Sequence, residues 1–394
     1  MDMSYTPEQS AFRQEVRDWI QSAMPPRIKK KAEQGASFEH EETTEWHKIL
    51  YKKGWIAPHW PKEHGGTGWD VTQQFIFNEE VIRAGSPVIP PFAVYMLAPL
   101  LIEFGSDEQK KRFLPKIASG DEQWCQGYSE PNAGSDLASL QCRADLEGDH
   151  FVLNGQKTWT SHAQYADWIF CLVRTDSASK KKQEGISFIL IDIKNTPGVE
   201  VKPFLTLGGL PSFCDTFFEN AKVPKANIVG KVNGGWTVAK ALLGHERITI
   251  SGINEAGRAL RLLKDMAANT KVGGQRLIDD VNFRQKLAIY EIKLRAIRMA
   301  QYRTLAATQH GKAPGPESSI LKLRGTELLQ LGYEIAMDVM GYNSFSWFNE
   351  EGVIPPQQQW IASQFNYLRA ATIYGGSNEI QRNIIAKLIL GLPA

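Results

Sequence analysis

Hydrophobic positions recur at helical spacing toward both ends of this chain and in short continuous runs in its middle. Near the start, Phe12, Val16 and Ile20 lie four residues apart, a spacing that brings side chains onto one face of a helix. Beyond residue 232, amphipathic stretches cover about 236–267, 280–311, 317–341, 358–373 and 378–390. Long amphipathic segments of this kind are typical of a helix bundle. Both ends of the chain are therefore predicted to be helical.

Between residues 124 and 231 the pattern changes to runs typical of β-strands. The runs begin at Phe151, Trp168 and Ile186, and no helical pattern separates them, which favours an antiparallel sheet over a parallel one. The dipeptide Asn154–Gly155 lies between two extended runs and predicts a hairpin, because both positions of a type I′ turn favour positive φ. The predicted fold is α+β, with an N-terminal helical domain at 1–123, a β-barrel-like antiparallel domain at 124–231 and a C-terminal helix bundle at 232–394.

Composition and charge exclude several classes of protein. The length of 394 residues favours two or three domains. Lys+Arg at 45 and Asp+Glu at 43 leave a net charge of +2, without the basic excess of a nucleic-acid-binding protein. The most apolar stretch, 87–102, is interrupted by four prolines and predicts a buried helix and loop rather than a membrane span. Four cysteines without C-x-x-C spacing and scattered histidines predict reduced thiols and no metal site.

Two segments of the middle region carry groups suited to ligand binding. Tyr128–Asp136 is rich in small residues, and its turn can present backbone N–H groups with the hydroxyls of Ser129 and Ser135. In an alternating strand, Trp159 and Ser161 fall on one face, where an indole beside a hydroxyl can stack on an aromatic cofactor. Each segment also has a plainer interpretation, an ordinary turn in the first case and a tryptophan facing the core in the second.

A third segment lies near the C-terminus. Two glycines at 375–376 precede Ser377 and Asn378 at the predicted start of an amphipathic helix. Free amides at a helix start, with the helix dipole behind them, favour an anion. The alternative is an ordinary capped helix, in which Asn378 and Gln381 form an analogue of a capping box.

Together these segments resemble the acyl-CoA dehydrogenase family of flavoenzymes. The motifs Ser-Glu-Pro-x-x-Gly-Ser-Asp, Asn-Gly-x-Lys-x-Trp and Gly-Gly-Ser-x-Glu-Ile-Gln-Arg occur in the family's order and spacing, and the resemblance covers essentially the whole chain. The chain looks closest to the large subunits of the pimeloyl-CoA dehydrogenase type, which are bacterial and often heteromeric. The resemblance implies a cytoplasmic bacterial enzyme of carboxylic acid catabolism or β-oxidation that uses FAD to convert an acyl-CoA into a trans-2-enoyl-CoA. It also implies that an electron-transfer flavoprotein receives the electrons.

The resemblance also indicates where the catalytic base lies. In many family members the base follows the tyrosine of the near-terminal motif, but this chain has Gly375 there, which has no titratable side chain. A second family position precedes an arginine in the first helix of the C-terminal domain, and here it is Glu246, before Arg247. Glu246 shares an apolar helical stripe with Leu242, Ile250 and Ile253. Desolvation on such a stripe raises the pKa of a carboxyl toward that of a useful base. The alternative is a rim glutamate paired with Arg247 or Lys240.

The resemblance assigns ligand contacts to further residues. The flavin is expected to contact Tyr128, Ser129, Gly134, Ser135, Trp159, Thr160, Ser161, Ser377 and Glu379. The acyl-CoA is expected to lie near Ser135, Arg247 and Tyr95. Gly375 is expected to offer its N–H to the thioester oxygen, which makes it a catalytic position despite its lack of a side chain.

Two departures from the family pattern concern its cross-subunit FAD contacts. The stretch Ala268–Leu277 lacks the Arg-x-x-Phe-Gly segment that reaches a neighbouring subunit's FAD, and the paired-glycine stretch is altered at Gly341–Ser344. A homotetramer or a heterotetramer with a paralogous subunit is expected, and both departures favour the heteromer. They also leave open an alternative in which this chain is a non-catalytic or half-site partner subunit of a heteromeric acyl-CoA dehydrogenase.

Overall fold

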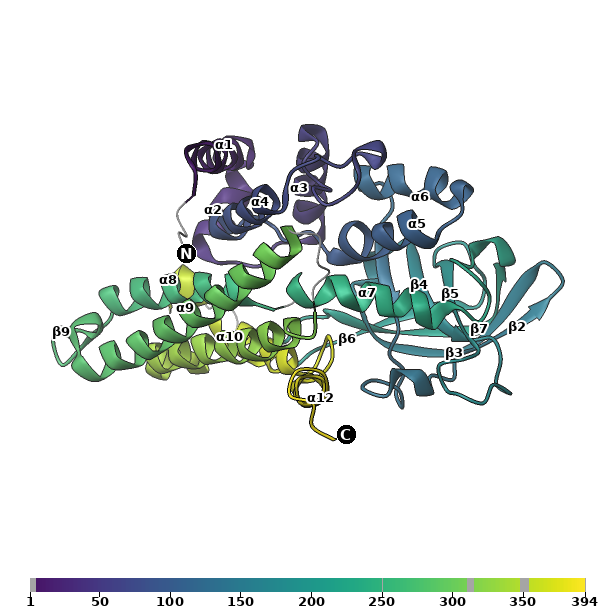
Figure 1. Cartoon of the computed structure of the whole chain (residues 1–394). Helices are drawn as coiled ribbons and strands as arrows, with labels where there is room; N and C mark the ends of the chain where they lie inside the picture. The colour runs from purple at the N-terminus through teal and green to yellow at the C-terminus, as the bar shows by residue number, and fades with distance from the viewer. Residues whose placement is uncertain (1–4, 250, 310–314, 348–353, 394) are drawn as a thin grey trace. The chain divides into compact units, whose positions relative to one another are not determined.

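The computed structural model describes residues 5–249, 251–309, 315–347 and 354–393. Helices precede and follow a β-sheet along the chain (Figure 1). The helices before the sheet are α1 (Pro7–Ala23), α2 (Pro26–Gln34), α3 (His40–Lys53), α4 (Val71–Ala84), α5 (Ala98–Phe104) and α6 (Asp107–Ser119). Those after it are α7 (Gly235–Thr249), α8 (Ile253–Asn269), α9 (Val281–Gln309), α10 (Ser318–Met340), α11 (Ile361–Tyr367) and α12 (Asn378–Leu388). The predicted α+β order is therefore confirmed.

The chain divides into two compact units. The first comprises Met1–Trp46, Gly68–Val88 and Arg247–Ala394, and the second comprises His47–Thr67 and Ile89–Glu246. The first unit thus combines α1, α2 and α4 with the helices from α8 onward, whereas α5 and α6 belong with the sheet.

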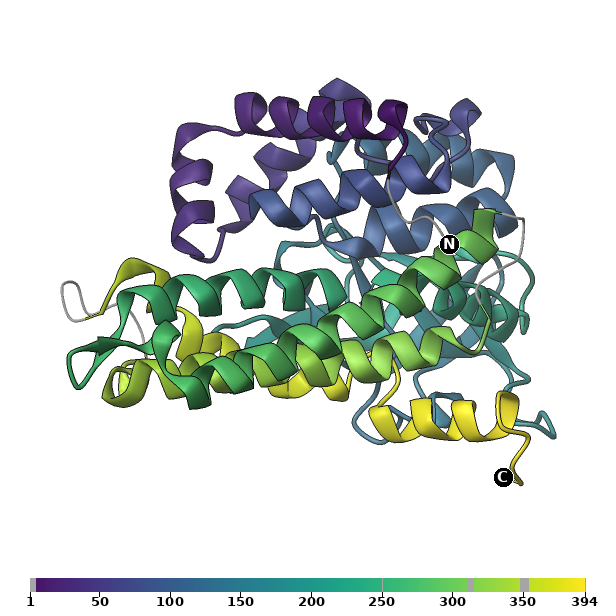
Figure 2. The same ribbon diagram turned by 60° about the vertical axis from the view of Figure 1, so that its left-hand side comes forward.

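The first unit has its core between three long helices. Helices α8, α9 and α10 run side by side (Figure 2). The phenol of Tyr290 on α9 is buried among them and donates to the carbonyl of Ala256 at 3.0 Å. Gly332 on α10 leaves the space for that ring, since a Cβ there would lie 2.7 Å from the Tyr290 hydroxyl. A close approach of this kind requires glycine.

The second unit is built on a seven-stranded sheet with the order β1-β4-β2-β3-β7-β6, in which β5 also pairs with β4. The strands are β1 (Trp124–Gly127), β2 (Arg143–Glu147), β3 (His150–Ser161), β4 (Trp168–Arg174), β5 (Ile186–Asp192), β6 (Val199–Phe204) and β7 (Phe213–Pro224). Most neighbours are antiparallel, as predicted, but β4 pairs in parallel with both β1 and β2.

The hairpin predicted at Asn154–Gly155 is wrong. Strand β3 runs straight through this dipeptide, and the ladder to β7 shifts register between Leu153 and Gly155. Such a shift is a β-bulge. Gly155 has a φ of 149°, and a Cβ there would lie 2.8 Å from Cys142 Cα. The Asn154 side chain accepts from the amide of Asn220 at 2.9 Å. The local turn signal therefore marks a bulge that long-range packing stabilises.

The predicted single helix over 236–267 is also wrong. Helix α7 ends at Thr249 and α8 begins at Ile253, with Gly252 in the left-handed region at a φ of 68°. A Cβ on Gly325 would lie 2.0 Å from the Ser251 carbonyl oxygen. The absence of a side chain at this distant position therefore leaves space for the backbone between α7 and α8. The expected stripe through Glu246 therefore does not continue to Ile253, and Ile250 lies outside the described residues.

A short two-stranded hairpin follows α8, within the stretch that lacks the family's arginine segment. Its strands are β8 (Lys271–Val272) and β9 (Gln275–Arg276). Gly273 and Gly274 both have positive φ, the geometry that a two-residue connection favours.

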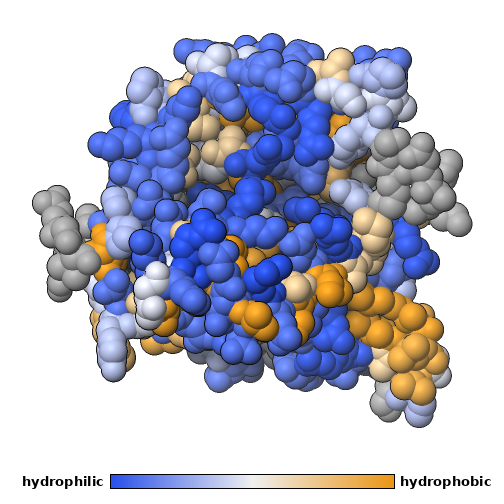
Figure 3. All heavy atoms as spheres, turned by 90° about the vertical axis from the view of Figure 1, so that its left-hand side faces the viewer, coloured by the Kyte–Doolittle hydropathy of each residue, from blue (hydrophilic) through white to orange (hydrophobic). Residues whose placement is uncertain are grey.

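Apolar side chains are exposed at the end of the chain. The exposed residues at and beyond the end of α12 are Leu388, Ile389, Leu390 and Leu392. Hydrophobic residues gather at one corner of the face that Figure 3 shows. Contiguous exposed apolar surface is typical of sites where another molecule binds.

The apolar stretch 87–102 forms a π-helical segment, Phe92–Leu97, followed by α5. Val94, Leu97 and Leu101 are fully buried, in agreement with the prediction of a buried helix and loop. Across the described ranges, the structure contains no helix with the length and apolarity that a bilayer crossing requires.

Gly155→Ala is predicted to destabilise the second unit by about 2–4 kcal/mol, because it adds a steric clash to an unfavourable φ. Gly148→Ala is the matched control, since Gly148 has a φ of 64° but nothing within 4 Å of a Cβ. It should cost only about 1–2 kcal/mol. Thermal unfolding of the two variants checks this, and equal losses would contradict the proposed close contact with Cys142.

Candidate functional site

A buried ion pair joins the small-residue turn to strand β3. The Lys157 Nζ lies 2.7 Å from Glu130 Oε1 and also donates to the Tyr128 carbonyl at 3.2 Å. Lys157 has no exposed surface. The Glu130 carboxylate accepts the backbone amides of Gln141 at 2.6 Å and Cys142 at 2.9 Å. A buried charge is tolerated when it is paired and hydrogen-bonded in this way.

The turn itself leaves donors pointing to solvent. Glu130 and Ala133 exchange two backbone hydrogen bonds, of 2.9 and 3.0 Å, which close the turn. Gly134 and Ser135 follow and are exposed. Within the described part of the chain, the amides of these two residues donate to no protein group. A Cβ on Gly134 would meet nothing within 4 Å, so there is space in front of it for a ligand.

Trp159 has an unusual backbone and an outward side chain. Its φ is 58°, which is uncommon for a bulky residue and costs conformational energy. The ladder shifts register between Lys157 and Thr160, so Trp159 lies in a bulge. Its ring is 58% exposed and meets Phe204 and Phe213 edge-on, with centroids 5.2 and 5.6 Å away. The interpretation of Trp159 as a core residue is therefore wrong.

Two of the residues expected to contact the flavin, Thr160 and Tyr128, are buried. Thr160 is fully buried, and its hydroxyl donates to the Cys214 carbonyl at 2.7 Å and contacts Thr216 Oγ1 at 2.9 Å. Tyr128 is buried as well, whereas Ser161 is partly exposed at the end of β3. In this structure Thr160 therefore stabilises the bulge that carries Trp159.

In the first unit, the near-terminal motif forms a turn before α12. Gly375 and Gly376 have left-handed φ values of 61° and 80°. Ser377 is the N-cap of α12 and accepts from the amide of Ile380 at 3.4 Å. The Gln381 side chain donates to the carbonyls of both glycines, at 3.2 and 3.1 Å. The side chain of Gln381 in α12 therefore holds the conformation of the turn that precedes this helix.

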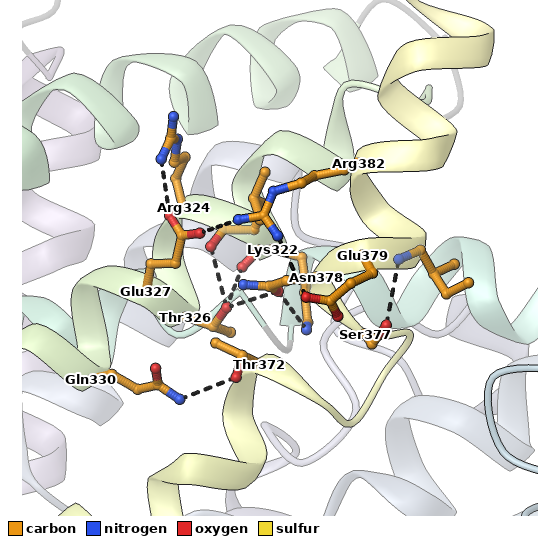
Figure 4. A network of polar contacts seen from close by, with 12 residues as sticks. Lys322, Arg324, Thr326, Glu327, Gln330, Thr372, Ser377, Asn378, Glu379 and Arg382 are labelled. Carbon is orange, nitrogen blue, oxygen red and sulfur yellow. Dashed lines mark hydrogen bonds and ion pairs between the residues drawn. The ribbon is translucent and has the colours of Figure 1, made fainter. Parts of the chain in front are cut away.

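A second fully buried lysine holds this helix start. Lys322 on α10 donates to Asn378 Oδ1 at 3.0 Å, and Thr326 Oγ1 reaches the same oxygen at 3.4 Å (Figure 4). Burial lowers the pKa of Lys322 to about 8, although Glu379 acts in the opposite direction. The ammonium group and the amide oxygen together anchor the first turn of α12 on α10.

Outside the buried contact, the ion pair of Arg382 with Glu327 joins the same two helices, and each partner has a further ion pair within its own helix. Glu327 on α10 accepts from Arg324 at 2.9 Å and from Arg382 of α12 at 2.9 Å. Arg382 also lies 3.6 Å from Glu379 (Figure 4). These residues are at least partly exposed, so each pair contributes little by itself. The buried lysine is the stronger constraint.

For some of the remaining predicted residues, the structure describes the backbone alone. Glu246 and Arg247 lie in α7, but their side chains are outside the described residues, so their roles stay predictions. Sequence reasoning did not single out Glu255, in the first turn of α8. Burial raises the pKa of this carboxyl, and Arg258 opposes the shift. In the sequence, the sign of a desolvated carboxyl would have been a charged residue close to the apolar Ile253 and Ala256. This sign can be interpreted only when the first residue of α8 is known.

Tyr95 lies in the π-helical segment and stacks on His59, with ring centroids 4.8 Å apart. The His59 Nε2 donates to the Val94 carbonyl at 3.1 Å. Burial raises the pKa of Tyr95 to about 12, so its hydroxyl keeps the proton. π-Helical segments occur frequently at functional sites.

These donor sets suit a flavin. The second unit offers an exposed indole on β3 and, in the turn hydrogen-bonded to that strand, free amides and hydroxyls, which match a planar aromatic ring with polar edges. The first unit offers a helix start with two preceding glycines, which matches an anionic group. Across the described residues, no group of three or more His, Cys, Asp or Glu side chains is placed to hold a metal ion.

Family models match the chain in three consecutive pieces. The model of the acyl-CoA dehydrogenase N-terminal domain matches residues 6–121, the middle domain 125–221 and the C-terminal domain 233–390. The chain is 37% identical over 405 residues to acyl-CoA dehydrogenase FadE26 of Mycobacterium tuberculosis, covering 100% of this chain and 99% of that protein.

Two solved structures are similar over their whole lengths. The ChsE4–ChsE5 complex of Mycobacterium tuberculosis contains a chain with a TM-score of 0.86 and 35% identity, with 100% of both chains covered. A structure described as the Tcur3481–Tcur3483 steroid ACAD gives a TM-score of 0.86 at 33% identity, again with 100% of both chains covered.

Lys322→Met is predicted to change the pH dependence of stability. Below pH about 8 the buried lysine is protonated at a cost, because the unfolded chain, with a lysine pKa near 10.5, binds that proton more tightly. This cost fades as the pH rises toward 10.5. The free energy of unfolding of the wild type, relative to the variant, should therefore rise by about 1–3 kcal/mol between pH 8 and 10.

Denaturant unfolding at several pH values measures this difference. Arg382→Met is the control, because it removes only exposed pairs, with Glu327 and Glu379, and should leave the pH dependence of the wild type intact. A difference between the wild type and Lys322→Met that stays flat from pH 8 to 10 would contradict the assigned state of Lys322.

Proposed function

The chain belongs to the acyl-CoA dehydrogenase family, and on this premise we propose that it is an FAD-dependent enzyme that oxidises an acyl-CoA to a trans-2-enoyl-CoA. When bound, FAD supplies the acceptor, at N5, for the hydride that leaves the β-carbon, and an electron-transfer flavoprotein then receives the electrons. The observation that carries the proposal is the outward Trp159 in a strained bulge of β3, the strand to which the turn with the free amides of Gly134 and Ser135 is hydrogen-bonded. A structural turn and a core tryptophan would require neither feature.

Glu246 is proposed as the base that takes the α-proton of the thioester. Leu242, one turn earlier on α7, is buried, and residues four apart lie on the same face of a helix. A carboxylate on that face loses hydration, which raises its pKa and makes it a stronger base. Arg247 is proposed to help hold the acyl-CoA beside it.

Gly375 is proposed to stabilise the charge that develops on the thioester oxygen. Its left-handed φ and the hydrogen bond from Gln381 to its carbonyl fix the turn before any substrate binds. A donor that is already fixed costs no reorganisation when the charge appears. The N–H of Gly375 therefore replaces, in this role, the side chain that the position lacks.

Flavin contacts are proposed for each unit taken by itself. In the second unit, Ser129, Gly134, Ser135, Trp159 and Ser161 are proposed to contact the flavin ring, with the buried Tyr128 and Thr160 supporting these residues. In the first unit, Ser377 and Glu379 are proposed to contact the ribose and diphosphate of a bound FAD. Ser135 is proposed to lie near the CoA as well.

We propose that the acyl group is bulky and alicyclic, of the steroid side-chain class. The support is the similarity over the entire chain to a structure described as a steroid ACAD. The expected likeness to the pimeloyl-CoA type stays a prediction, and a linear dicarboxylic acyl-CoA is the substrate that would support it. Tyr95, stacked on His59, is proposed to line the acyl pocket.

The chain is further proposed to function in a heterotetramer with a paralogous subunit. Both similar structures carry names of two-chain assemblies, and the chain exposes apolar residues at the end of α12. The second candidate function is a non-catalytic or half-site subunit, which the altered Ala268–Leu277 stretch favours. The two differ in whether this chain supplies the base.

Glu246→Gln is predicted to lower kcat by about 10²–10⁴-fold while FAD still binds, because only proton abstraction is lost. Glu255→Gln is the control, since it neutralises another desolvated carboxyl and should keep kcat within a few fold. Turnover of a panel of acyl-CoA thioesters with an artificial acceptor measures both, using the chain copurified with its partner subunit. Full activity of Glu246→Gln would refute the assignment, and loss of activity only in Glu255→Gln would transfer the role to that residue.

A further inference from the structure

We propose that the Lys157–Glu130 ion pair is a positioning pair, which fixes the two flavin-facing segments of the second unit relative to each other. The inference rests on the proposed function, because it concerns how the same FAD site is held. Neither residue is proposed to touch the cofactor, since Lys157 has no exposed surface and Glu130 is buried. The pair acts through the backbone groups that it binds.

The pair holds the turn at both of its ends. Lys157 Nζ binds the carbonyl of Tyr128, where the turn begins. Glu130 binds the amides of Gln141 and Cys142, where the chain leaves the turn for β2. The buried ion pair thus connects the two ends of the segment 128–142. The exposed amides of 134 and 135 lie within that closed segment.

The same pair lies next to the strained tryptophan. Lys157 is two residues before Trp159 in β3, and between them the amide of Thr158 donates to the Ser129 carbonyl at 2.9 Å. The turn and the bulge therefore meet at adjacent residues of one strand. A change in the Lys157–Glu130 distance moves the free amides and the indole relative to each other, and a flavin that contacts both would bind less well.

Stability alone does not require such a pair. Replacing a buried ion pair by neutral groups of similar size is often neutral or stabilising, whereas removing one partner leaves an uncompensated charge and is strongly destabilising. A purely structural role therefore predicts that a double neutral variant regains every property. A positioning role predicts that it regains stability and not flavin affinity.

The test compares Lys157→Met, Glu130→Gln and the double variant, each copurified with the partner subunit. Melting temperature, FAD dissociation constant of the apoprotein and visible flavin spectrum are measured. Both single variants should have a lower melting temperature than the wild type, and their FAD dissociation constants should be about tenfold higher or more. The double variant should regain most of the melting temperature and keep the weakened binding and an altered spectrum.

Lys182→Met is the matched control, because it removes an exposed ion pair of 2.8 Å to Asp136 in the same turn. It should change none of the three measured properties. Glu130→Asp serves if the double variant does not fold, since it keeps the charge and shortens the reach. It should retain the melting temperature and still weaken FAD binding.

Recovery of FAD affinity in the double variant, or full affinity in Glu130→Asp, would overturn the inference. A comparable loss of affinity in Lys182→Met would overturn it too. A wild-type preparation that binds no FAD at all would instead refute the proposed function, and the inference with it. The two failures are therefore distinguished by the wild type alone.

Discussion

A lysine buried in a β-sheet must find a counter-charge and hydrogen-bond acceptors, and this requirement organises the ligand-facing part of the second unit. Lys157 meets it with Glu130 and with the Tyr128 carbonyl. Because the partners come from a segment 27 residues earlier, satisfying one ammonium group draws a whole turn onto β3. The free amides of Gly134 and Ser135 lie within that turn, and the exposed Trp159 lies two residues after Lys157 in β3.

The first unit solves a similar problem with different chemistry. Lys322 is equally buried, but its partner is the neutral amide of Asn378, and burial lowers the pKa of Lys322 to about 8. In both units a buried lysine anchors a glycine-containing turn, and these two turns carry the backbone donors proposed to contact a ligand. Rigid donors of this kind favour charge that develops during a reaction over charge already present in the substrate.

The sequence predicted the α+β order, because periodicity is a local property, whereas the three segments that motif spacing assigns to the site stay predictions. It did not predict the fate of Asn154–Gly155, where the need for an unusual φ was correct but the hairpin was not. That outcome depends on Cys142 and Asn220, which are distant in sequence. The end of α7 likewise depends on Gly325 in another helix. The burial of Lys157 could not be predicted either, because it depends on a partner that is distant in sequence, and periodicity does not identify the partner of a buried charge.

The central claim is that this chain holds FAD and removes two hydrogens from an acyl-CoA. Anaerobic mixing of the flavin-loaded protein, copurified with its partner, with a steroid side-chain acyl-CoA tests it most directly. The account predicts loss of the oxidised flavin absorbance with formation of one equivalent of the trans-2-enoyl thioester. A protein that carries no flavin, or a flavin that stays oxidised with steroid, branched, linear and dicarboxylic thioesters alike, would contradict it.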